Sequence, residues 1–237
     1  PSKEIAVNEY AKSFRILEAL NMFGFLLSGL LLPMFSKIFK KDQIPNELFY
    51  TAQGLSIAIA IPLGLSSIYY SQNIMQLLYF DDATAEILKW HLMAFIINTI
   101  SYVFGTLITA QGSIHKLNLL FLSGCVLNVG LNIWIIPNYG PVGTAWTTFL
   151  TQLFILAGQA YYAFKIIGLR FETSSWVRYL IFSILVFGIF VLVEHHVFLM
   201  WYVEYLLFII FSMTLSLVTG VVKIRSTLLV LRSKFNV

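Results

Sequence analysis

Residues 117–164 read LNLLFLSGCVLNVGLNIWIIPNYGPVGTAWTTFLTQLFILAGQAYYAF, and this stretch decides the fold. It contains no Asp, Glu, Lys or Arg. A helix that crosses the roughly 30 Å of bilayer hydrocarbon needs about 20 mostly apolar residues, so the stretch is long enough for two crossings. Pro137–Pro141, with two prolines and a glycine, is typical of a turn. The stretch therefore predicts two membrane-spanning helices, Leu117–Ile136 and Val142–Phe164, joined by that turn.

The composition of the whole chain agrees with a membrane protein. Hydrophobic residues make up 59% of the 237 positions and charged residues 11%. A soluble domain carries about 25% charged residues, because its surface must meet water. The mean hydropathy is +0.83. A single cysteine, Cys125, excludes an internal disulfide, and its apolar surroundings predict a small packed core residue.

Hydrophobic stretches of spanning length recur along the chain. They predict an all-α fold, a polytopic transmembrane bundle of about seven helices. The expected spans are Tyr10–Phe35, Leu48–Tyr70, Ile87–Thr109, Leu117–Ile136, Val142–Phe164, Trp176–Val193 and Trp201–Val222.

The distribution of basic residues predicts the orientation of the bundle. Short cytoplasmic loops are enriched in Lys and Arg, and seven spans place the two chain ends on opposite sides. The side that holds the C-terminus has 11 of the 15 basic residues, namely Lys37, Lys40, Lys41, Lys116, Lys165, Arg170, Arg178, Lys223, Arg225, Arg232 and Lys234. We therefore expect the N-terminus outside and the C-terminus in the cytoplasm. The net charge of +4 then indicates contact with anionic lipid headgroups rather than nucleic-acid binding.

Polar residues in the first predicted helix are the strongest functional signal. Glu4, Asn8, Lys12 and Arg15 fall on one arc of a helical wheel, with Glu18 at its edge. An Arg inside a bilayer costs about 2.5–3.5 kcal/mol on insertion scales, so it needs a partner or a watery cavity. Lys12 can extend to the headgroups, and Arg15 can pair with Glu18. Alternatively the arc lines a polar cavity where Arg15 binds an anion, since a guanidinium matches phosphate oxygens.

Other polar residues within the spans are open to a structural or a functional interpretation. Asn128 and Asn132 lie one helical turn apart, so they either bond neighbouring helices or line a pathway. His91, beside Lys89 and Trp90, is expected to lie at the outer membrane interface rather than to carry protons. The same two interpretations hold for Gln53, Asn98, Ser101, Gln152 and Gln159.

No motif in the sequence indicates catalysis. The chain has no glycine-rich phosphate loop, no nucleophile motif and no paired active-site carboxylates. We therefore expect a protein that is not an enzyme, with no cofactor and no metal site.

Three segments resemble one known family, the bacterial polysaccharide flippases of the O-antigen type. YAKSFRI at 10–16 is similar to the family's tyrosine, small residues, aromatic and basic residue, and LPMFSK at 32–37 is similar to its helix end. NVGLNIWIIPNYGPVGTAW at 128–146 is similar to its most specific turn. The family shares a superfamily with the lipid II flippase and the multidrug and toxin extruders.

The resemblance implies a fourteen-helix transporter in the bacterial inner membrane, of which this chain is the C-terminal half. Residues 1–168 would form about five helices of the second transport lobe, and 169–237 two further spans and a basic cytoplasmic tail. A start at Pro1 rather than Met agrees with the expectation that the protein's own N-terminal lobe is missing.

The resemblance also implies the substrate, an undecaprenyl-pyrophosphate-linked oligosaccharide moved by alternating access for the synthesis of a polysaccharide such as the O-antigen of lipopolysaccharide. Arg15 matches a basic position in the cavity between the lobes, whereas Lys12 falls where many members have a small residue. Ion coupling is implied without identifying the ion, and Glu18 is the carboxylate we nominate for it.

Two alternative functions remain from the sequence. A multidrug extruder would favour apolar cations, and Arg15 in the cavity counts against it. A membrane-embedded glycosyltransferase or polymerase would need acid or base residues in a large outer loop, whereas the outer loops here are short.

Overall fold

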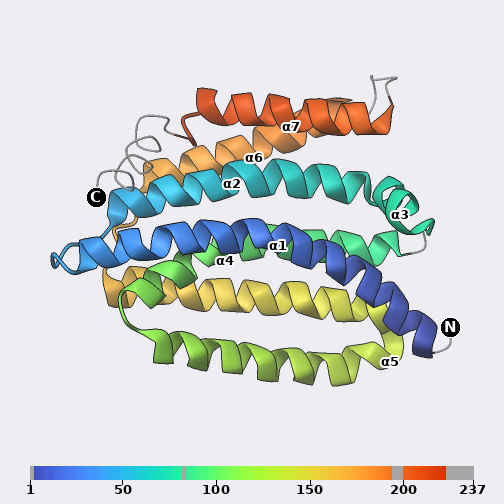
Figure 1. Ribbon diagram of the computed structural model, residues 1–237, viewed down its shortest axis with the longest axis horizontal. Helices are drawn as coiled ribbons and strands as arrows, with labels where there is room; N and C mark the ends of the chain where they lie inside the picture. The colour runs from blue at the N-terminus through green and yellow to red at the C-terminus, as the bar shows by residue number, and fades with distance from the viewer. Residues whose placement is uncertain (1–2, 82–83, 194–199, 223–237) are drawn as a thin grey trace.

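The structure, a computed structural model, describes residues 3–81, 84–193 and 200–222. These described residues form helices and connections, with no strand among them, which confirms the all-α fold (Figure 1). The helices are α1 (Lys3–Phe39), α2 (Asn46–Tyr69), α3 (Ser71–Tyr79), α4 (Ala85–Ala110), α5 (Ile114–Tyr161), the π-helical η1 (Tyr162–Ile167), α6 (Thr173–Val193) and α7 (Trp201–Val218).

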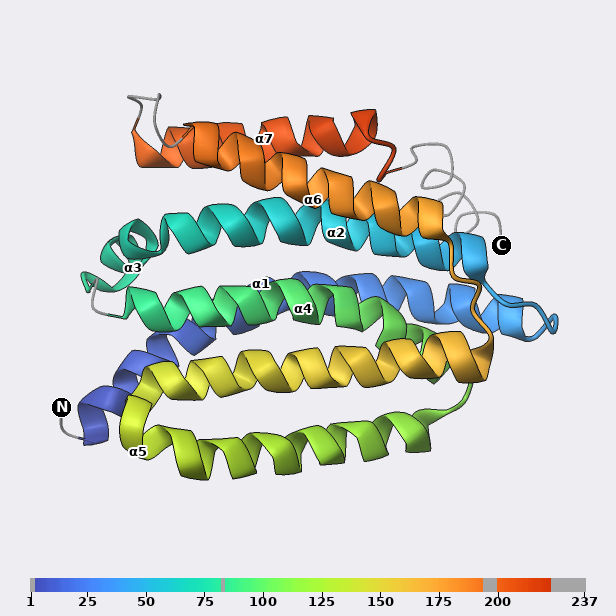
Figure 2. The same ribbon diagram turned by 180° about the vertical axis from the view of Figure 1, so that it is seen from behind.

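The chain folds back within α5, so this element holds two antiparallel limbs (Figure 2). The reversal occurs at Gly140, whose φ of 54° and ψ of −140° are not helical. A positive φ is adopted at little cost by glycine, which has no Cβ. Residues 114–139 are called the first limb and residues 141–161 the second limb. The two helices predicted from the opening stretch are therefore present, and the turn between them is shorter than the expected five residues.

Most of the predicted membrane crossings correspond to helices that are long and apolar enough to span a bilayer. Five helical runs have the length and hydropathy of a span, namely α1, α2, α4, α7 and α5 continued through η1. The two limbs of α5 correspond to the fourth and fifth crossings predicted from the sequence. The sixth predicted crossing corresponds to α6, which has a shorter apolar helix, Thr173–Ile189. Leu122, Val126 and Ile133 on the first limb are 61–73% exposed, as expected for side chains that face lipid. The chain is thus a multi-pass membrane protein.

The long helices lie side by side, and their ends gather at two opposite ends of the bundle (Figures 1 and 2). The start of α1, α3, the Gly140 turn and the start of α7 lie together at what we call the N-terminal end. The α1–α2, α4–α5 and η1–α6 connections lie at the other end. This basic end holds Lys37, Lys40, Lys41, Lys116, Lys165 and Arg170.

α4 occupies the centre of the bundle. It packs against α1, α2 and α5, whereas α6 and α7 pack against the far side of α2. The hydroxyl of Tyr70, just after α2, donates to Glu204 of α7 at 2.6 Å. Burial, together with the Glu204 carboxylate, raises the pKa of Tyr70 and keeps the phenol a donor. α7 is thereby attached to α2 at the N-terminal end.

Three details differ from the sequence predictions. α1 extends beyond the predicted Tyr10–Phe35 at both ends, because charged residues disfavour burial in lipid but not helix formation. α3 was not predicted, since nine residues are too few to span a bilayer. Cys125 is exposed on the first limb rather than packed in the core, because apolar side chains on a membrane helix face lipid as readily as protein.

Candidate functional site

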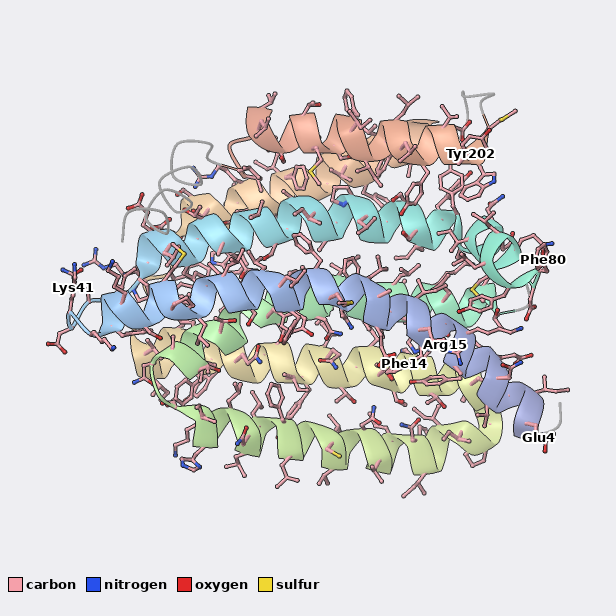
Figure 3. The ribbon with its side chains drawn as sticks, viewed as in Figure 1. Glu4, Phe14, Arg15, Lys41, Phe80 and Tyr202 are labelled. Atoms are coloured by element: carbon pink, nitrogen blue, oxygen red, sulfur yellow. The ribbon has the colours of Figure 1, made fainter. Side chains whose placement is uncertain are left out.

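Arg15 and Glu18 lie on the exposed face of α1, where Figure 3 shows the Arg15 side chain. Farther along the same face, Met22, Phe25 and Leu26 are 61–66% exposed. Within the part of the chain that the structure describes, neither Arg15 nor Glu18 makes a hydrogen bond or an ion pair. The Arg15–Glu18 pair that the sequence allowed is therefore not formed, and the guanidinium is open to a ligand from outside this bundle.

The level of Arg15 in the bundle follows from its neighbour Ser13. The Ser13 hydroxyl lies 2.9 Å from Nδ1 of His91. His91 is the seventh residue of α4, and α1 and α4 run in the same direction (Figure 1). At about 1.5 Å per residue, Arg15 therefore lies about 12 Å inside the start of α4. Since α4 is itself a candidate span, the exposed Arg15 lies at a level between the two ends of the bundle, not beyond the helix ends.

Lys12 is held by an acidic partner at the N-terminal end. Its Nζ donates to Oδ2 of Asp81 at 2.6 Å, and it lies 5.9 Å from the centre of the Tyr79 ring. Both charged side chains are about four-fifths buried, with exposed fractions of 19% and 25%. The charge of Lys12 is thus compensated within the bundle, unlike that of Arg15.

Asn128 and Asn132 connect the two limbs of α5. Nδ2 of Asn132 donates to Oδ1 of Asn128 at 2.9 Å, and Nδ2 of Asn128 donates to the Thr151 hydroxyl at 3.1 Å. The Thr147 hydroxyl in turn donates to Oδ1 of Asn132 at 2.9 Å. A bond across the hairpin satisfies polar groups that lipid cannot, so the network has a clear structural use.

A polar cavity of about 440 Å³ lies between α1, α4 and both limbs of α5. Two of its lining residues are bonded to each other, since Ser101 donates to Oε1 of Gln159 at 2.7 Å. Four polar residues that the sequence analysis named line this cavity, and so do two residues of α1 that it did not name, Asn21 and Ser28. Amides and hydroxyls dominate the lining, which includes Asn21, Asn98, Ser101, Thr106, Gln152 and Gln159.

His91, which the sequence predicts at the outer membrane interface, faces a neighbouring helix rather than the surface of the bundle. Its side chain is fully buried between α1 and α4. The position of a residue near a helix end gives its depth along the helix, but not whether its side chain faces lipid or a neighbouring helix. Gln53 is likewise buried, in α2 and away from the polar cavity.

No protein-family profile matches this sequence. The chain is 25% identical over 173 residues to an uncharacterized membrane protein of Methanocaldococcus jannaschii, and the aligned part is 70% of this chain and 33% of that protein. The fold of this chain is similar to that of the lipid II flippase MurJ in an inward closed conformation, with a TM-score of 0.74 and 16% sequence identity. That match covers 89% of this chain and 46% of the flippase. The chain thus spans a third of the first relative and just under half of the second.

Proposed function

We propose that this chain is one lobe of a transporter that moves an undecaprenyl-pyrophosphate-linked oligosaccharide across the inner (plasma) membrane. The proposal rests on Arg15, which is exposed on α1 at a level between the two ends of the bundle. Arg15 has no partner among the described residues. A charge at such depth is costly without compensation. The compensation is supplied by the substrate, whose pyrophosphate is anionic.

The chemistry of the exposed face of α1 suits such a substrate. A guanidinium binds phosphate oxygens through two parallel hydrogen bonds, which a lysine ammonium cannot do. The apolar side chains of Met22, Phe25 and Leu26 follow Arg15 along the same face. This face therefore offers a charged contact for the headgroup beside an apolar surface for a prenyl chain.

The proposed mechanism is alternating access, in which two lobes rock about a site between them. The likeness to 46% of a lipid II flippase supports the assignment of this chain to one lobe, with α1 as a wall of the shared cavity. The second lobe is the partner that the activity requires. We place the basic end in the cytoplasm, where Lys and Arg are enriched in short loops.

The test is transport of a fluorescent lipid-linked oligosaccharide by the full-length protein in proteoliposomes. We expect Arg15→Ala to slow flipping by at least about tenfold, because a hydrogen bond to a charged group is worth about 1.5–3 kcal/mol. Arg15→Lys should restore part of the rate, since it retains the charge but not the bidentate geometry.

The matched control is Lys37→Ala, which removes an exposed basic side chain from the opposite end of the same helix. It should leave the flipping rate unchanged. An unaltered rate in Arg15→Ala would contradict the proposed role of Arg15. Extrusion of apolar cations without any glycan transport would instead favour the multidrug extruder.

A further inference from the structure

His91 is a titratable residue that the proposed substrate site does not use. Its imidazole is fully buried, and so is Ser13 opposite it on α1. The ring centres of Tyr10 and Phe14 lie 4.9 Å and 5.7 Å from the imidazole, each in an edge-to-face arrangement. The N-terminal part of the interface between α1 and α4 thus encloses one histidine.

Nδ1 is the imidazole nitrogen that has a hydrogen-bond partner at this interface. The Ser13 hydroxyl has a single hydrogen, which it donates to the backbone oxygen of Tyr10 at 3.0 Å. The Ser13 oxygen then accepts a hydrogen bond from Nδ1–H of His91 at 2.9 Å. With the Ser13 hydrogen on the Tyr10 carbonyl, Nε2 is the nitrogen with the lone pair; Nε2 is buried with no hydrogen-bond partner.

An unsatisfied buried polar atom costs about 1–3 kcal/mol, so its retention calls for an explanation. A basic lone pair is the atom that accepts a proton, and an imidazole can hold one proton on each of its two nitrogens. This site has the atoms needed to bind one proton at Nε2.

No described carboxylate contacts the imidazole to balance that charge. The neighbouring ionisable groups are Glu9, Tyr10, Lys12 and Arg15 on α1, Tyr69 and Tyr70 at the end of α2, Tyr79 on α3, Asp81 after it, and Glu86 and Lys89 on α4. The α5 side chains packed against the adjacent Trp90 are Trp146 and Phe149, which are uncharged. Asp81 pairs with Lys12, and Glu86 pairs with Lys89. A proton on His91 therefore places an unbalanced charge between two tightly packed helices.

From this geometry we infer that His91 is a proton-binding site, and that its protonation loosens α1 from α4 and couples proton entry to transport. The coupling rests on the proposed function, because α1 also bears Arg15 and is a wall of the proposed cavity. Nε2 takes a proton from solution while Nδ1 keeps its own. The imidazolium is then solvated by separation of the two helices, which moves the wall that binds the substrate.

The first experiment follows the helix interface directly and needs no substrate. Hydrogen exchange of the α1 backbone amides is measured by mass spectrometry in the full-length protein, near pH 5 and near pH 7.5, after correction for intrinsic exchange. We expect exchange in residues 9–20 to rise several-fold at the lower pH. His91→Gln, which has no titratable group, should abolish this rise.

His115→Gln is the matched control, since His115 is an exposed histidine on the first limb at the basic end. It should retain the full pH response of α1. An α1 exchange rate that does not change with pH, or that changes equally in His91→Gln, would overturn the inference. This readout is independent of transport, so a failed proton site and a failed flippase assignment are distinguished.

The second experiment tests the coupling in proteoliposomes with a pH gradient. The wild-type protein and His115→Gln should flip the lipid-linked oligosaccharide several-fold faster with the gradient than without it. His91→Gln should flip at one rate in both conditions. An equal response to the gradient in His91→Gln would remove the coupling role, even if α1 loosens on protonation.

Discussion

Two glutamines of similar burial differ in their surroundings, and they make a test of what a buried amide costs. Gln53 on α2 is 0% exposed and neither of its amide atoms has a hydrogen-bond partner, whereas Gln159 is 2% exposed and accepts a bond from Ser101. An unmade buried hydrogen bond costs about 1–3 kcal/mol. Gln53→Leu is therefore expected to raise the Tm by a few degrees.

Gln159→Leu is the control, because the same substitution there leaves the Ser101 hydroxyl without its acceptor. It should lower the Tm, and thermal unfolding of the two purified variants in one detergent compares them directly. A lower Tm in Gln53→Leu would contradict this prediction, because it would mean that the Gln53 amide does have a hydrogen-bond partner.

The sequence could predict which polar residues share one face of a helix, but not their partners on another helix. The helical wheel placed Arg15 on a polar arc, and the structure has it exposed there. The partner of Lys12 is Asp81, 69 positions away, and no local spacing indicates that pair. The surroundings of His91 could not be predicted for the same reason, since they come from α1.

At the scale of helices, α7 docks on α2 at a glycine. A Cβ built on Gly54 would collide with the backbone oxygen of Val221, which follows α7. Backbone cannot move aside as a flexible side chain can, and overpacking a core costs about 1–3 kcal/mol. We expect Gly54→Ala to lower the free energy of unfolding by about that amount.

Gly130→Ala is the matched control, since a Cβ on Gly130 of the first limb meets nothing within 4 Å. Alanine in a helix is more stable than glycine by about 0.5–1 kcal/mol, so this variant should gain stability. Denaturant unfolding measures both variants. Equal stability of Gly54→Ala and the wild type would mean that α7 shifts at no cost.

Hydrophobic length predicted the spanning helices well, because the bilayer sets the same requirement for each of them. The bounds of α4 agree with the prediction to within two residues at each end. α3 was missed because SQNIMQLLY has neither the length nor the uniform hydrophobicity of a span. Its fold depends on Met75, which is buried against α4.

For the whole molecule, the basic end predicts the orientation in the membrane. Thiol labelling tests it in a Cys125→Ser background, because Cys125 is exposed. Phe80→Cys places a thiol at the N-terminal end, where Phe80 is 86% exposed, and Lys41→Cys places one at the basic end (Figure 3). In intact cells a membrane-impermeant maleimide should label only the former.

Permeabilised cells are the control, in which both thiols should react. Labelling of Lys41→Cys alone in intact cells would reverse the assigned orientation. The likeness in fold could not have settled this point, because a bundle has the same internal contacts whichever way it faces.

The reversal at Gly140 also bears on how the protein is made. A ribosome adds about 5–20 residues per second, so the 48 residues of α5 are synthesised in roughly 2–10 s. With a single glycine between the limbs, no polar loop waits to be translocated after the first limb has entered the bilayer. We therefore expect the insertion machinery to release the two limbs together, with the bonds between Asn128, Asn132 and the second limb formed as they leave it.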